Sequence, residues 1–226
     1  MNYIKGCLYG IFSICPGLSG GLLAIQFGDY QKLLTIINKK DFKINNIIYL
    51  FALFIGFISG SAFFSNVVIY LYSKFNTVFI IIIIVINIFL LITFIKKFRY
   101  KFSKFVTMFI ISMFLILVIK KININFVGQN TFFLYFISGI IFSFSKIVPG
   151  VSGTTLLINV NFYKNILSFF SNPFSELFYN FNLWIVFWLT FIIFSFILIK
   201  ILFNYQKYLN DISVIVMIIC ILNLII

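Results

Sequence analysis

Long apolar segments separated by short polar links dominate this chain. A helix needs about 20 apolar residues to cross the ~30 Å hydrocarbon core of a bilayer. Uninterrupted spans are predicted at 46–72, 77–95, 105–119, 179–203 and 211–226. Two further apolar segments, 3–37 and 132–170, each contain a Pro-Gly pair, which interrupts a helix. The pattern therefore predicts an all-α integral membrane protein with five full spans and two broken segments.

The two broken segments carry the same motif. Residues 14–21 read Ile-Cys-Pro-Gly-Leu-Ser-Gly-Gly, and residues 147–154 read Ile-Val-Pro-Gly-Val-Ser-Gly-Thr. Proline disfavours helix at the residue before it, and glycine permits turns that are closed to other residues. Adding the offset between the two copies to the first two spans gives segments close to the last two. Each repeat, 3–95 and 132–226, is therefore predicted as one helical hairpin plus two spans, with 105–119 as a bridging transmembrane helix.

The hairpins are predicted to be re-entrant, because the thirteen or so residues before Pro16 reach only ~20 Å as a helix. Three full spans separate the hairpins, so they would enter from opposite faces and the repeats would be inverted. With 96–104 in the cytoplasm, twelve basic residues lie on that side and four on the other, as the positive-inside rule expects. If each motif segment instead crossed the membrane as one broken helix, this contrast would weaken.

Composition and charge agree with a membrane protein. The chain is 63% hydrophobic and only 9% charged, against about 25% charged residues in an ordinary soluble domain. A net charge of +13 could suggest nucleic acid as a partner, but most basic residues stand at the ends of apolar segments, so we expect no nucleic-acid binding. Removal of the first thirty residues as a signal peptide would delete one motif copy, and we expect them to stay.

The repeated motif predicts an anion site. Helices that start after the Pro-Gly pairs would present free N–H groups and positive dipole ends, assisted by nearby hydroxyls. Lys146 would add a cation deep in the membrane, where it needs a partner such as phosphate. It could instead snorkel to an interface or pair with backbone carbonyls, and Ser13 holds the matching position in the first copy. The predicted phosphate-binding residues are Ser13, Pro16, Gly17, Ser19, Gly20, Gly21, Lys146, Pro149, Gly150, Ser152, Gly153, Thr154 and Thr155.

Other features have a structural explanation beside the functional one. Gly56 and Gly60 form a GxxxG pair suited to close helix contact, although incidental small residues are an equal alternative. Several polar residues follow each motif by one to two turns and could line a substrate path. Solvated hairpin ends are the favoured interpretation for this set, Asp29 above all. The set is Gln26, Asp29, Tyr30, Asn159, Asn161 and Tyr163.

An enzyme is the contrasting class. The chain has no histidine, and its four acids are scattered toward segment ends, so the usual groups for acid–base or metal-assisted chemistry are missing. We therefore predict no catalytic residues, no metal site and no cofactor. A serine nucleophile would have only Lys146 as a base. An ion channel would use rings of charge or carbonyls, which the sequence neither shows nor excludes.

At these motifs the chain resembles the PopT-type family of bacterial membrane proteins. The duplicated Pro-Gly-x-Ser-Gly and the sequence Gly28-Asp29-Tyr30 carry the resemblance, which is strongest over 6–34 and 139–167. Members of this family are implicated in returning undecaprenyl phosphate, the carrier lipid of cell-wall synthesis, across the cytoplasmic membrane. Phe12-Ser13 stand where the family usually has Ala-Asp, and Lys146 replaces a commonly apolar residue. The chain thus looks like a short, divergent member whose coupling could differ.

The resemblance implies a lipid flippase of the bacterial cytoplasmic membrane. Its substrate would be undecaprenyl phosphate or a similar polyprenyl phosphate, and its environment the bilayer. A coupling ion, either a proton or sodium, is an open alternative, and the sequence leaves the oligomeric state open. The runner-up is a transporter of a small soluble anion through the same site, and a third candidate is a lipid-modifying enzyme. A lateral opening wide enough for a lipid tail would distinguish the first from the second.

Overall fold

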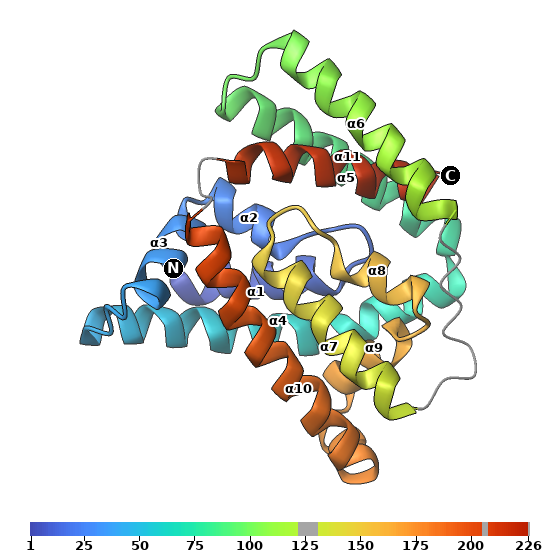
Figure 1. Ribbon diagram of the computed structural model, residues 1–226. Helices are drawn as coiled ribbons and strands as arrows, with labels where there is room; N and C mark the ends of the chain where they lie inside the picture. The colour runs from blue at the N-terminus through green and yellow to red at the C-terminus, as the bar shows by residue number, and fades with distance from the viewer. Residues whose placement is uncertain (122–130, 205–207, 226) are drawn as a thin grey trace.

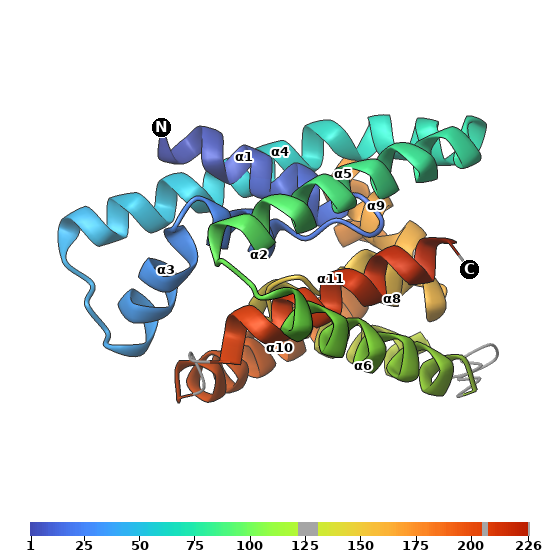
Figure 2. The same ribbon diagram turned by 90° about the horizontal axis from the view of Figure 1, so that it is seen from above.

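Helices account for all the regular secondary structure in the residues that the computed structural model describes, 1–121, 131–204 and 208–225 (Figures 1 and 2). Most of the connection between the predicted bridging helix, 105–119, and the second broken segment, 132–170, lies outside these residues. The helices are α1 (Asn2–Ile14), α2 (Gly20–Gln26), α3 (Asp29–Asn38), α4 (Ile44–Lys74), α5 (Asn76–Lys97), α6 (Phe102–Lys121), α7 (Thr131–Ile147), α8 (Gly153–Asn159), α9 (Tyr163–Ser171), α10 (Pro173–Asn204) and α11 (Leu209–Ile225).

Within the described part of the chain, the helices α4, α5 and α10 are long and apolar enough to cross a membrane. This agrees with the predicted all-helical membrane protein. The helix α11 has 17 residues, shorter than a typical span. The order of α1 to α5 is repeated by α7 to α11, and α2 and α8 begin at equivalent positions of the two motif copies, Gly20 and Gly153. The internal repeat seen in the motif thus extends to the order of helices.

The segments after the motifs differ in detail from the prediction. Each was expected to be one half-helix, but each is divided into two short helices, α2–α3 and α8–α9. The divisions coincide with left-handed backbone at Gly28 (φ 77°) and Asn161 (φ 58°), which an α-helix cannot contain. The fourth predicted span also begins earlier, at Pro173, and is kinked at Asn180.

The helices α1 and α4 pack backbone to backbone. A Cβ atom at Gly6 or Gly10 of α1 would overlap with carbonyl oxygens of α4, and one at Gly56 or Gly60 would overlap with carbonyl oxygens of α1. Small residues allow this approach, which in lipid gains van der Waals contact rather than a hydrophobic driving force. Of the two interpretations that the sequence left open for the GxxxG pair, close helix contact is the one that the structure shows.

The helices α7 and α10 form the corresponding pair of the second half, and α5, α6 and α11 lie at the top of Figure 1, where α11 packs against the other two. The halves also contact each other crosswise, α3 against α10 and α9 against α4. The short helices α3 and α9 thereby connect the two halves, each packing against a long helix of the other half.

Candidate functional site

Both motifs break the chain in the same way. Helix α1 ends at Ile14, Cys15 is extended as expected before a proline, and Gly17 turns the chain with φ 79°. In the second copy α7 ends at Ile147 and Gly150 takes φ 86°. A side chain at either glycine would be strained in this left-handed conformation. The sequence therefore fixes two equivalent turns, each followed by a short helix.

The two breaks lie against each other. Lys146 Nζ donates a hydrogen bond to the carbonyl oxygen of Ser13 at 3.0 Å. Thr154 Oγ1 donates to the carbonyl oxygen of Cys15 at 2.9 Å. A Cβ atom on Gly21 would lie 3.5 Å from the Cα atom of Pro149, an ordinary van der Waals distance. Residues from both motifs thus share one contact region in the middle of the protein.

Two tyrosines join the breaks reciprocally. Tyr30 donates its hydroxyl hydrogen bond to the carbonyl oxygen of Ile147, and Tyr163 donates to the carbonyl oxygen of Ile14 at 2.9 Å. The two donors occupy equivalent positions of the repeat, and so do the two acceptors. Each acceptor lies at the C-terminal end of the first helix of the opposite copy, where carbonyl groups lack intrahelical partners.

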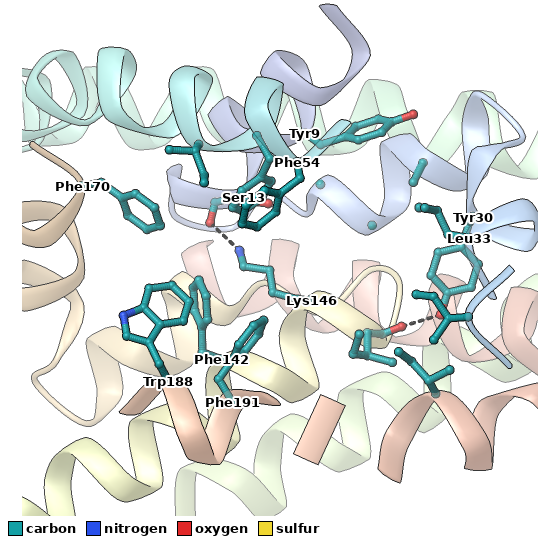
Figure 3. A pocket seen from close by; sticks show the side chains of 18 of the residues that line it. Tyr9, Ser13, Tyr30, Leu33, Phe54, Phe142, Lys146, Phe170, Trp188 and Phe191 are labelled. Atoms are coloured by element: carbon teal, nitrogen blue, oxygen red, sulfur yellow. Dashed lines mark hydrogen bonds between the residues drawn. The ribbon is translucent and has the colours of Figure 1, made fainter. Parts of the chain in front are cut away.

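A cavity of about 690 Å³ adjoins this contact region. Its walls come from α1, α2, α3, α4, α7 and α10, with Phe169 and Phe170 of α9, and most lining side chains are aliphatic or aromatic. Among the described residues that line it, Lys146 alone is charged. Figure 3 shows its ammonium between Ser13 and a group of aromatic rings that includes Phe142. The cavity is therefore an apolar chamber with one cation.

The surroundings of Lys146 supply little countercharge. Its Nζ lies 4.5 Å from the ring centroid of Phe142 and 5.8 Å from that of Phe57, within cation–π range. All four acids of the chain are described, and none forms an ion pair with Lys146. Backbone oxygen and aromatic faces thus solvate the cation, and an anion would find it without a competing carboxylate.

Four of the thirteen predicted site residues line the cavity: Ser13, Gly20, Gly21 and Lys146. The remaining nine do not line it; they are Pro16, Gly17, Ser19, Pro149, Gly150, Ser152, Gly153, Thr154 and Thr155. Gly17 and Gly150 face α11, where added Cβ atoms would lie within 3 Å of Leu224 and Ser213. These two glycines permit close packing in addition to the turn.

The two N-cap serines differ. Ser152 Oγ accepts a hydrogen bond from the backbone N–H of Thr155 at 3.4 Å and lies 2.9 Å from Thr154 Oγ1. Ser19 Oγ is buried and has no hydrogen-bond partner among the described residues. The helices that they cap, α2 and α8, have seven residues each, so their dipoles are short. Phosphate binding by the helix N-termini stays a prediction, and Lys146 is the stronger candidate.

Asp29 does not lie in a solvated hairpin end, and that interpretation was wrong. It is 7% exposed, accepts a hydrogen bond from Tyr9 at 2.6 Å and forms an ion pair with Lys5 at 2.8 Å. Helix α1 supplies both donors from one face, because Lys5 and Tyr9 are four residues apart. Among the other polar residues that follow the motifs, Tyr30 lines the cavity. The side chain of Asn159 is not among those that the structure describes.

Sequence reasoning missed the aromatic wall of the cavity. Phe57, Phe142, Trp188 and Phe191 come from three helices, and the abundance of Phe, 34 residues, hides them in the sequence. Their helical spacing was the available signal, since Trp188 and Phe191 are three residues apart on α10. Only the packing of α4, α7 and α10 shows that they converge.

Comparison with known protein families gives one result. A family model described as undecaprenyl phosphate translocase-like matches residues 9–226, so the chain belongs to this family. The family expected from the repeated motif is thereby confirmed. Searches of curated proteins and of solved structures returned no match. The family description points to a transporter rather than an enzyme, and with the apolar helices it indicates a multi-pass membrane protein.

Proposed function

We propose that this protein moves a polyprenyl phosphate, undecaprenyl phosphate or a close relative, between the leaflets of the bacterial cytoplasmic membrane. The phosphate binds at Lys146, and the isoprenoid chain stays in apolar surroundings throughout. The single observation that carries this proposal is the ammonium of Lys146, the one charged group among the described residues that line this largely apolar cavity. The family description is consistent with it.

The chemistry of the cavity fits an anionic amphiphile. A lysine ammonium has three N–H donors, and the carbonyl oxygen of Ser13 accepts one of them. An ionised side chain at membrane depth is costly unless a partner compensates it, so phosphate oxygens would stabilise the site. The aliphatic and aromatic walls would contact the first isoprene units. One ligand with a charged head and an apolar chain satisfies both parts.

A small soluble anion fits the same cavity less well. Such an anion would leave its hydration shell for walls that offer few hydrogen-bond donors besides Lys146. A lipid phosphate also loses hydration, but burial of its chain against these walls compensates part of that cost. The apolar lining therefore favours the lipid.

The repeat suggests how the site could be exposed alternately to the two leaflets. The reciprocal tyrosine bonds, and the contact between the equivalent positions Ser13 and Lys146, support a two-fold relation between the copies. We place the axis in the membrane plane, as in other transporters built from inverted repeats, with both motif segments as re-entrant hairpins. Lys146 would then lie near the midplane, and rocking of one copy against the other would open either side.

The test is leaflet exchange of labelled undecaprenyl phosphate in proteoliposomes. Lys146→Met should lower the exchange rate at least tenfold, because it removes the charge and keeps the length of the side chain. Lys164→Met is the matched control, since Lys164 is exposed on α9 and does not line the cavity, and it should stay within twofold of wild type.

Two outcomes would contradict the proposal in different ways. Wild-type exchange no faster than in protein-free vesicles would refute transport of this lipid. Equal exchange by the Lys146→Met and Lys164→Met variants, both faster than protein-free vesicles, would refute the assigned site while leaving transport in place.

A further inference from the structure

We propose that a groove between α3 and α4 holds the isoprenoid chain where it leaves the Lys146 cavity for the bilayer. This inference rests on the proposed function and names the route of the lipid tail. The groove has a volume of about 560 Å³ and is lined by residues of α1, α3, the 39–43 loop and α4. Figure 2 shows α3 and the start of α4 joined by this loop at one end of the protein.

The groove continues the Lys146 cavity. Four residues line both spaces: Tyr9, Leu33, Phe54 and Phe57. Three of them are labelled along the cavity in Figure 3, where Tyr9 and Phe54 lie on the α4 side and Leu33 near Tyr30. A ligand in the cavity would therefore extend into the groove along these shared residues, without passing between packed helices.

One face of α4 forms most of the groove. Ile47, Leu50, Phe51 and Phe54 line it at spacings of three and four residues, which place them on one side of a helix. Ile47, Phe51 and Phe54 are 48%, 63% and 61% exposed, so this face is open to the bilayer. The groove thus connects a cavity inside the protein with the lipid around it.

The size and chemistry of the two spaces select the tail as occupant. A cavity of about 300–1,000 Å³ accommodates a drug-sized ligand, and a long polyprenyl chain is far larger, so most of the chain must lie elsewhere. The described residues that line the groove are all apolar except Tyr9, whose hydroxyl donates a hydrogen bond to Asp29. A phosphate would find no cation among these side chains, whereas an isoprenoid chain would match them.

Tyr9 is held at the threshold between the two spaces. Its hydroxyl donates to Asp29, which is also paired with Lys5, and its ring packs beside Phe27. The polar end of Tyr9 is therefore satisfied away from the passage, and its ring is left to contact the chain. Through this hydrogen bond Asp29 acts as a positioning residue for the threshold.

The test fills the groove and measures lipid exchange in proteoliposomes. Ile47→Trp places an indole in the groove and should lower exchange of undecaprenyl phosphate at least fivefold. Ile82→Trp is the matched control, because Ile82 on α5 is 50% exposed and lines neither space. The loss in Ile47→Trp should be smaller for geranyl phosphate, whose short chain needs less of the groove. A diazirine near the phosphate end of a long-chain analogue should label the 47–57 segment of α4.

The outcomes separate this inference from the proposed function. If Ile47→Trp and Ile82→Trp exchange lipid equally while Lys146→Met is impaired, the tail route is wrong and the phosphate site stands. Labelling of the 47–57 segment that is equally strong with a phosphatidylglycerol analogue would mean a groove for bulk lipid, and would also overturn the inference. Wild-type exchange at the protein-free rate would instead remove the proposed function itself.

Discussion

The helix pairs α1–α4 and α7–α10 occupy corresponding places in the two halves, but different side chains hold them together. Four glycines bring α1 and α4 into backbone contact, whereas α7 and α10 meet through Gly139 and a cluster of rings. The rings of Tyr135, Phe142, Trp184, Phe187 and Trp188 lie 5.2–6.4 Å apart where they pair. Glycine contact and aromatic contact thus support the same arrangement of helices.

The polar residues differ in the same way. Lys5, Tyr9 and Asp29 form a charged cluster in the first half, and the equivalent positions of the second copy are Ser138, Phe142 and Phe162. Phe142 and Phe162 pack against Phe187 of α10. The backbone plan therefore persists while the interior chemistry diverges, and the charged cluster lies beside the groove that we assign to the lipid tail.

The largest loss of stability is expected between α1 and α4, where the glycines leave no room for a side chain. A Cβ atom in Gly56→Ala would overlap with the carbonyl oxygen of Tyr3, and backbone cannot move aside without separating the helices. We expect the free energy of unfolding in detergent to fall by about 4 kcal/mol, the upper range for a single substitution.

Gly21→Ala is the control for this substitution. Its nearest neighbours would lie 3.5–3.7 Å from the added Cβ atom, so its stability should stay within about 1 kcal/mol of wild type. Equal losses in the two variants would show that contact between α1 and α4 is less tight than described.

A smaller loss of stability is expected from a substitution between α7 and α10, the helix pair that meets through aromatic rings. Trp184 is fully buried and contacts Tyr135, Phe162, Phe169 and Phe187. Trp184→Ala should lower the free energy of unfolding by about 3 kcal/mol, because it leaves a cavity that the neighbouring rings fill only in part. Trp184→Phe should recover more than half of this loss. No recovery with Phe would indicate that ring size, rather than aromatic contact, determines the stability of this half.

The sequence predicted the regular part of this fold better than its interior. Apolar length and the Pro-Gly pairs indicated the long helices of the described residues and both breaks, apart from the early start of α10, since these features follow from backbone rules. Gly28 was not recognised as a division between helices, because a single glycine is tolerated within many helical patterns. Asn161 gave even less signal, although asparagine adopts left-handed backbone more readily than most residues.

The sequence indicated the cation that lies in the cavity, Lys146, but it did not indicate the aromatic residues that line the cavity. Lys146 stood out as an ionisable residue far from any polar link, and the structure places it in the cavity. The burial of Asp29 depends on Lys5, Tyr9 and the fold of α1 against α3, so the local polar surroundings misled the prediction. Contacts between residues far apart in the chain, such as Tyr30 with Ile147, have no signature in a single sequence.

The smallest loss of stability is expected at the tyrosine hydrogen bonds, a feature that the two halves share. Tyr30→Phe and Tyr163→Phe each remove one of the reciprocal hydrogen bonds and leave a carbonyl group, at Ile147 or Ile14, without that donor. Each should lower the free energy of unfolding by about 1 kcal/mol, the net value of a typical hydrogen bond. The two losses should be equal within error in chemical unfolding, despite the different helix pairs around them. A loss several times larger in one variant would mean that the two copies are not equivalent at the breaks, and that one tyrosine stabilises the contact between the halves far more than the other.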